Sequence, residues 1–108
     1  MELNILRADP AGNITVFVLD PVEKVQRAAI AEKIMAIPAL KAEQVGYACA
    51  AEDDVDGHME MMGGEFCGNA TRAYGMYIAQ QKGGLSSVRL RVSGCDHVVT
   101  AQVDLKSG

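Results

Sequence analysis

Short apolar runs alternate with polar turn segments along the chain, and most of these runs predict β-strands. Ile14–Leu19 is rich in β-branched residues and apolar at successive positions, which is typical of a strand buried on both faces. Ser87–Ser93 alternates apolar residues with arginines, which predicts a half-buried strand that forms a hairpin with a strand over 98–105. The other predicted strands are Leu3–Ala8, Gln44–Ala51 and Gly57–Met62.

A first helix is predicted directly after the buried strand. Asp20 can cap a helix N-terminus, Pro21 suits the first helical position, and Glu23 can supply the acid of a capping box. Pro38 ends this segment at about residue 37, because a proline disfavours helical backbone at the residue before it.

A second helix is predicted over Ala70–Lys82, ending at two glycines. Its apolar residues cover most of its circumference, which is typical of an enclosed helix. Gly75 lies in its middle at a cost of about 1 kcal/mol against alanine, so we expect a close packing partner there. The pattern predicts an α+β fold in which a curved, mixed and largely antiparallel sheet wraps around this helix, with the first helix outside. We expect residues 1–108 to form a single domain.

Composition narrows the function classes. The 108 residues are 49% apolar and 22% charged, which is typical of a globular domain that needs no disulfide or metal to fold. No apolar run is long enough to span a membrane, and the first residues do not resemble a secretory leader, so we expect a cytoplasmic protein. The net charge of −4 and the absence of a basic cluster argue against nucleic acid as a partner.

The cysteines indicate reduced thiols. Their number, three, is odd, and no two of them have CxxC spacing. With the two histidines they make five candidate metal ligands that are scattered singly along the chain, at Cys49, His58, Cys67, Cys95 and His97. This spacing predicts neither a metal site nor a cofactor.

Candidate chemistry concentrates where the second helix begins. Two glycines turn the chain after a strand, and Cys67 precedes the helix. The free N–H groups of a helix N-terminus attract anions and favour a thiolate over a thiol. Gly68 allows a ligand close to the backbone, and the Asn69 amide can hold a second polar group. The segment therefore predicts a thiolate beside a bound carboxylate.

The residues alone leave the use of this thiol open. Attack on a carbonyl would need a histidine partner, and His58 and His97 lie in other segments. The thiolate could instead remove the proton next to the bound carboxylate, with backbone donors stabilising the enolate. The third alternative is a structural Cys67 that only packs at the helix start.

The run Cys67-Gly68-Asn69, followed by Thr71-Arg72, resembles the first catalytic signature of the diaminopimelate epimerase family. The resemblance implies a cofactor-independent amino-acid racemase or epimerase. In that family two similar lobes, each a curved sheet around a central helix, supply one cysteine each. One cysteine removes the α-proton and the other reprotonates the opposite face. By resemblance Cys67 is one of these two bases, and Gly68 and Asn69 bind substrate.

Two further matches extend the resemblance over nearly all of the chain. Ala11-Gly12-Asn13 resembles the family's Gly-Asn turn, which implies that Asn13 binds substrate. Val45-Gly46-Tyr47 resembles its glycine-aromatic strand start. A substrate-binding glutamine follows that pair in the family, and Cys49 stands at its position here.

The departures indicate another amino acid than diaminopimelate as the substrate. Ile14-Thr15 and Ala48-Cys49 replace the family's Asp-Phe and Asp-Gln pairs, and the loop before Cys67 is shorter. These changes fall where the distal end of the substrate would be bound.

The chain resembles only the first lobe, so we expect a missing C-terminal half or a partner chain to complete the site. Homo-oligomerisation is left open. Two other functions compete with the racemase. One is a proton-shifting isomerase on the same fold, with Glu65 as its acid. The other is a non-catalytic ligand-binding or assembly domain with a structural cysteine.

Overall fold

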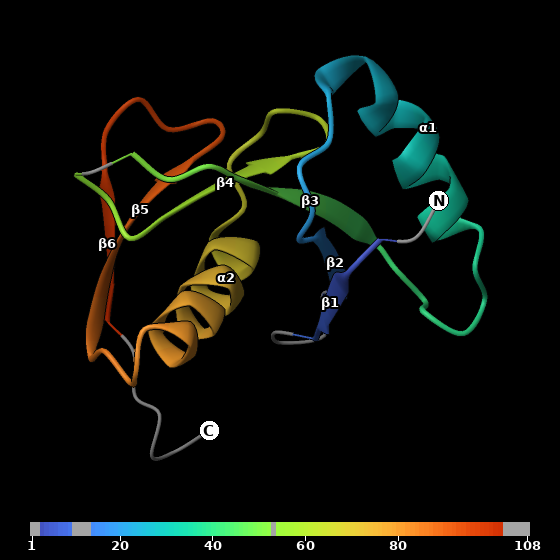
Figure 1. Ribbon diagram of the computed structural model, residues 1–108. Helices are drawn as coiled ribbons and strands as arrows, with labels where there is room; N and C mark the ends of the chain where they lie inside the picture. The colour runs from blue at the N-terminus through green and yellow to red at the C-terminus, as the bar shows by residue number, and fades with distance from the viewer. Residues whose placement is uncertain (1–2, 10–13, 53, 103–108) are drawn as a thin grey trace.

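A computed structural model describes residues 3–9, 14–52 and 54–102 as a six-stranded sheet with a helix on each face (Figure 1). The strands are β1 (Ile5–Ala8), β2 (Thr15–Val18), β3 (Gln44–Cys49), β4 (Gly57–Met61), β5 (Ser87–Val92) and β6 (Val99–Gln102). The helices are α1 (Lys24–Met35) and α2 (Gly68–Gln81). No helix in these ranges is long and apolar enough to cross a membrane.

The strands lie side by side in the order of the sequence. The β1–β2, β3–β4 and β5–β6 pairs are antiparallel, whereas β2–β3 and β4–β5 are parallel and are connected through α1 and α2. Parallel crossovers are almost always right-handed. Because the β3–β4 pair reverses the strand direction between the two crossovers, this rule places the helices on opposite faces, as observed.

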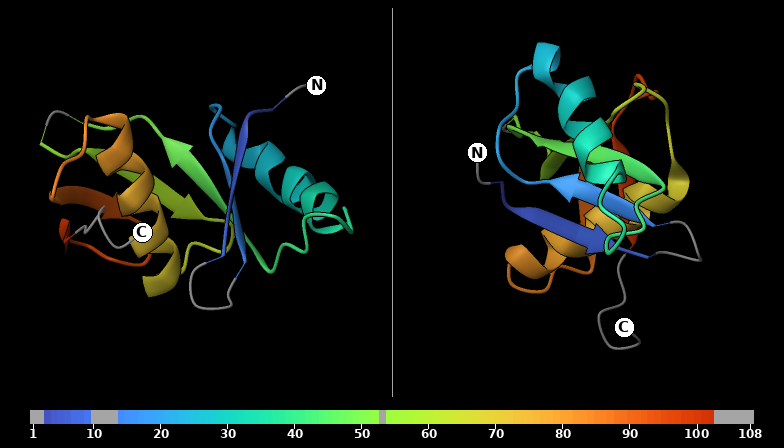
Figure 2. Two further views of the ribbon diagram at one scale, coloured as in Figure 1. Left: turned by 90° about the horizontal axis from the view of Figure 1, so that it is seen from below. Right: turned by 90° about the vertical axis from the view of Figure 1, so that its right-hand side faces the viewer.

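The sheet curves around α2 (Figure 2). Leu6 and Ala8 of β1 and Val99 and Ala101 of β6 come from opposite edges of the sheet, yet they pack against one core. That core is centred on Phe17, Met59, Ala70, Tyr74, Val88 and Leu90. The expected α+β fold, with a curved mixed sheet around a central helix and a second helix outside, is confirmed.

Strand β2 is buried on both faces because each helix uses one of them. Val16 and Val18 pack with Ala31 and Ile34 of α1, whereas Phe17 belongs to the core around α2. Every residue of β2 is fully buried, as its continuous apolar pattern predicts.

The predicted start of the first helix is wrong by three residues. α1 begins at Lys24, and its cap residue Glu23 makes no side-chain capping bond. Asp20 instead accepts hydrogen bonds from the backbone N–H of Asn4 at 2.5 Å and from its amide at 3.2 Å. The Asp20 carboxylate, which the local sequence predicts to cap the helix, therefore binds Asn4, 16 residues away.

Gly75 has the close packing partners that its position predicts. A Cβ atom at this residue would lie 3.2 Å from the Ala101 Cβ and 3.3 Å from the Val88 Cγ2. The glycine lets α2 approach β5 and β6 closely, which offsets its low helix propensity.

We expect Gly75→Val to destabilise the fold, because branched methyl groups would overlap β5 and β6. The expected loss in the free energy of unfolding, measured by urea titration, is about 1–3 kcal/mol. Gln80→Val places a valine at an exposed position of the same helix and should change the free energy of unfolding by less than about 0.5 kcal/mol. Equal losses in the two variants would show that β-branching in the helix, and not contact with the sheet, sets the effect.

Candidate functional site

Cys67 lies where the sequence predicts it, directly before α2. Its backbone is extended, with φ −131° and ψ 112°, and its side chain is half-buried. The Cys67 thiol donates a hydrogen bond to the Gln44 amide oxygen, with 3.4 Å between Sγ and Oε1. The thiol therefore stands at the start of the helix and faces a polar group of β3.

Gln44 connects Cys67 to the buried strand β2. Its amide oxygen also accepts a hydrogen bond of 3.0 Å from the hydroxyl of Thr15, a fully buried residue. Thr15 and Gln44 are directly paired in the parallel β2–β3 ladder. Sequence reasoning missed both residues. The available signal was a polar side chain at the start of each of two mostly buried strands.

The first turn of α2 is open. The Thr71 N–H donates the first bond of the helix to the Cys67 carbonyl at 2.9 Å, and the Thr71 hydroxyl donates to the same oxygen at 2.8 Å. Among the described residues, the N–H groups of residues 68–70 have no hydrogen-bond partner, and the first turn carries no acidic side chain. Ala70 is fully buried, so the two donors available beside the thiol are the N–H groups of Gly68 and Asn69, which is the arrangement of an anion site.

Gly68 and Asn69 border these donors. A Cβ atom at Gly68 would approach Arg72 Nη1 no closer than 3.5 Å, so packing within the chain does not require glycine here. The Asn69 amide oxygen accepts a hydrogen bond from the Arg72 guanidinium. This bond orients the Asn69 side chain and leaves its NH₂ group as a donor.

The turn after β5 holds the loop before Cys67. The Ser93 hydroxyl donates to the Glu65 carbonyl at 2.7 Å and accepts from the Met61 N–H at 2.8 Å. Gly94 has φ +75°, and a Cβ atom there would lie 2.2 Å from the Phe66 backbone nitrogen. Only glycine fits this contact, so β5 fixes the position from which α2 begins.

The predicted substrate-binding residues do not all come together. Cys67, Gly68 and Asn69 form one site on the α2 face of the sheet. Cys49 lies at the end of β3 on the α1 face, where its Sγ accepts a hydrogen bond from Arg27 Nη2 at 3.7 Å. Its contact with substrate stays a prediction. Asn13 lies outside the described residues.

Arg27 of α1 organises the polar groups on this second face. It forms a 2.6 Å ion pair with Glu60, which lowers the pKa of that carboxyl, and its guanidinium lies 5.1 Å from the centre of the Tyr47 ring. Burial raises the pKa of the Cys49 thiol, and the neighbouring Glu60 carboxylate raises it further. Cys49 is therefore held in its neutral form near pH 7.

Comparison with known proteins gives consistent matches. The family model for the histidine racemase CntK N-terminal domain matches residues 2–108. A histidine racemase of Fusobacterium nucleatum is 42% identical over 79 residues, which cover 71% of this chain and 27% of that protein. A histidine racemase of Staphylococcus aureus is 34% identical over 99 residues, which cover 88% of this chain and 36% of that protein.

The chain thus spans between about a quarter and a third of the length of these relatives. The family resemblance found at Cys67-Gly68-Asn69 agrees with these matches, and the three residues stand at the open start of the central helix. The chain belongs to the family of histidine racemase CntK N-terminal domains.

Proposed function

We propose that this chain is the N-terminal lobe of a cofactor-independent histidine racemase, in which the Cys67 thiolate is one of two bases. The observation that carries the proposal is the position of Cys67 Sγ beside the unpartnered, accessible N–H donors of Gly68 and Asn69 at the start of α2. The names of the relatives supply the substrate. The protein acts as a cytoplasmic enzyme, and residues 1–108 form one lobe.

Substrate binding follows from the open helix turn. The α-carboxylate of histidine accepts hydrogen bonds from the N–H groups of Gly68 and Asn69, and the absence of a side chain at Gly68 lets it approach the backbone. The NH₂ group of Asn69 adds a donor. By the family resemblance, Asn13 also binds the substrate. This arrangement directs the α-carbon of the substrate toward Cys67.

The reaction moves one proton on each face of the α-carbon. The Cys67 thiolate takes the α-proton, so the C–H bond breaks and an S–H bond forms. The electron pair delocalises into the carboxylate, where the N–H donors stabilise the added charge. A second acid then delivers a proton to the opposite face of the carbon, which inverts its configuration.

The second acid comes from another lobe. Cys49 lies on the other face of the sheet, where Arg27 and Glu60 hold it. The segments matched here cover 27% and 36% of the two relatives, which leaves room for a second lobe. This chain therefore contributes half of the active site.

The competing isomerase places its acid at Glu65. That side chain is exposed, and its carboxylate lies over Gly63, where a Cβ atom would be 2.9 Å from Oε1. A carboxylate turned back over its own loop is poorly placed for proton transfer at the helix start. The geometry favours the thiol.

We expect that the isolated chain does not racemise L-histidine, because it has only one of the two bases. A chimera in which this chain replaces the matching segment of the Fusobacterium nucleatum relative should racemise histidine. Chiral chromatography and loss of the α-proton in deuterated water measure the two outcomes.

Cys67→Ser should lower the activity of the chimera at least 1,000-fold, and Cys95→Ser should retain it. Rapid racemisation by the isolated chain would contradict the half-site. An active Cys67→Ser chimera would contradict the assignment of the base.

Gln44→Glu should slow the reaction of Cys67 with iodoacetamide at pH 7 by tenfold or more. A carboxylate at the position of the amide oxygen, 3.4 Å from Sγ, opposes removal of the thiol proton. Site-resolved mass spectrometry on the intact chain measures the rate for each cysteine. Gln102→Glu adds the same charge at an exposed position of β6 and should leave the rate unchanged. An unchanged rate in Gln44→Glu would show that the contact does not control the thiol.

Gly68→Ala should separate folding from binding. The added methyl group meets only ordinary van der Waals contacts, so the melting temperature should fall by no more than a degree or two. The same methyl group stands where the substrate carboxylate would approach the helix, so kcat/KM of the chimera should fall at least tenfold. A variant with unchanged kcat/KM would mean that the carboxylate binds elsewhere.

A further inference from the structure

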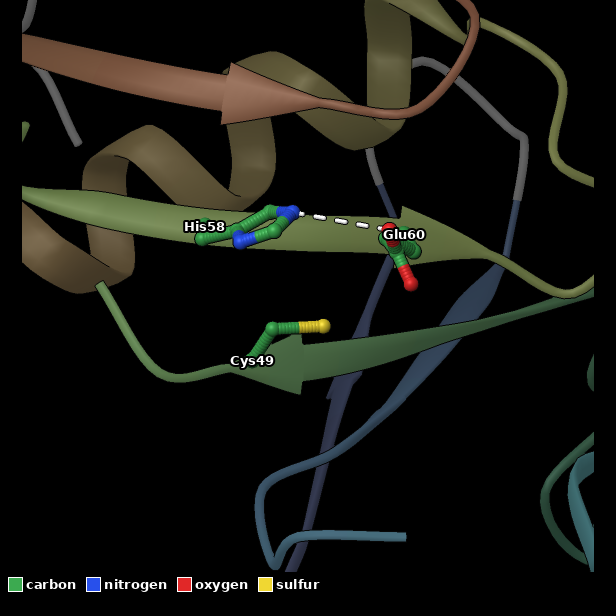
Figure 3. A group of neighbouring side chains, drawn as sticks. All are labelled: Cys49, His58 and Glu60. Atoms are coloured by element: carbon green, nitrogen blue, oxygen red, sulfur yellow. Dashed lines mark ion pairs between the residues drawn. The ribbon is translucent and has the colours of Figure 1, made fainter. Parts of the chain in front are cut away.

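Three side chains with metal-binding groups meet on one face of β3 and β4 (Figure 3). They are Cys49 of β3 and His58 and Glu60 of β4, and their ligand atoms all lie within 4.8 Å of one another. The side chains of His58 and Glu60 are 22% and 27% exposed, so the group is open to ions from solvent.

The register of the sheet creates this group. Cys49 and His58 are directly opposed in the antiparallel β3–β4 ladder, and Glu60 follows His58 by two residues on the same face. Their Cα atoms are therefore set by backbone hydrogen bonds and do not depend on a loop. In the sequence the same residues appear as isolated ligands, which is why spacing along the chain indicates no metal site.

The donor set suits zinc. Thiolate, imidazole and carboxylate are its usual protein ligands, and three of them with an open fourth position form a common type of site. Bonds of about 2.0–2.3 Å to one tetrahedral ion place its ligand atoms about 3.3–3.7 Å apart. The ligand atoms lie within 4.8 Å of one another, so side-chain rotations that move them by about an ångström would bring them into that range.

The Arg27 guanidinium places a positive charge beside Cys49 and Glu60. Its Nη1 lies 2.6 Å from Glu60, and its Nη2 lies 3.7 Å from Cys49 Sγ. Its Nε is buried and has no hydrogen-bond partner among the described residues, so the guanidinium is incompletely satisfied. A cation that binds both acceptors more strongly can displace it.

Arg27 borders two hollows that give room for this exchange. A cavity of about 410 Å³ is bordered by Arg27 and Cys49, and another of about 460 Å³ is bordered by Arg27 and Glu60. They give an ion a path to the ligands and give the guanidinium a position to move to.

We propose that Cys49, His58 and Glu60 form a zinc site in which Zn²⁺ and the Arg27 guanidinium compete for the same acceptors. The thiol proton is released to solvent when the Zn–S bond forms, and water completes the coordination. The site lies on the opposite face of the sheet from Cys67, so its occupancy does not depend on the racemase reaction.

Titration of the reduced 108-residue chain with Co²⁺ tests the ligands, because a cobalt–thiolate bond gives a near-ultraviolet charge-transfer band. We expect the band to saturate at one equivalent and Zn²⁺ to remove it. Cys49→Ser should abolish the band, and His58→Ala and Glu60→Gln should weaken binding at least tenfold. Cys67→Ser and Cys95→Ser, the matched thiol controls, should keep it. A band that survives in Cys49→Ser, or that is absent from the parent chain, overturns the proposal.

Arg27→Gln tests the competition. Removing the guanidinium should tighten Co²⁺ binding at least tenfold, since the ion no longer displaces a bound cation. Arg7→Gln removes an arginine of the edge strand β1, where its Nε donates to the Leu40 carbonyl at 2.8 Å and two strands separate it from β4, so it should leave affinity unchanged. Circular dichroism verifies that both variants are folded. Weaker binding in a folded Arg27→Gln variant overturns the competition and shows that Arg27 supports the ligands.

Discussion

The antiparallel pairing of β3 with β4 is the constraint on which the rest of the structure depends. It reverses the strand direction between two crossovers of the same hand, so α1 and α2 pack on opposite faces of one sheet. The same pairing divides the chemistry. Cys67 stands at the concave face with α2, whereas Cys49 and its charged neighbours stand at the convex face with α1. One backbone register therefore sets both the core and the separation of the two thiols.

The site at Cys67 is held from three directions. Gln44 and Thr15 fix the thiol from the parallel β2–β3 pair, and Ser93 and Gly94 fix the preceding loop from the turn after β5. All of these contacts come from rigid strands or from the turn next to one. A helix start that is anchored in this way can leave its own N–H groups free, because its position does not rely on a capping side chain. This freedom makes the turn available to an anion.

The local sequence pattern was sufficient to predict most of the strands and helices and the position of Cys67 before the second helix. The buried run of β2, the alternation in β5 and the glycines around the second helix each depend on neighbouring residues, and the structure agrees with them. Where contacts between residues far apart in the sequence decide the structure, the local pattern did not predict it. Asp20 looks like a helix cap but binds Asn4, 16 residues away. Cys49 and His58 are nine positions apart and become neighbours only through the β3–β4 register.

Cys49 and Cys67 have different surroundings, which suit the different roles proposed for them. Cys49 is half-buried beside a carboxylate, and both effects raise its pKa, so at neutral pH it is a poor base. A zinc ion would reverse that preference, because the ion replaces the thiol proton and neutralises the carboxylate at once. Cys67 faces an amide oxygen and the open end of a helix, where added negative charge meets free N–H donors. The role proposed for Cys67 therefore fits its free N–H donors, and the role proposed for Cys49 fits the imidazole and carboxylate beside it.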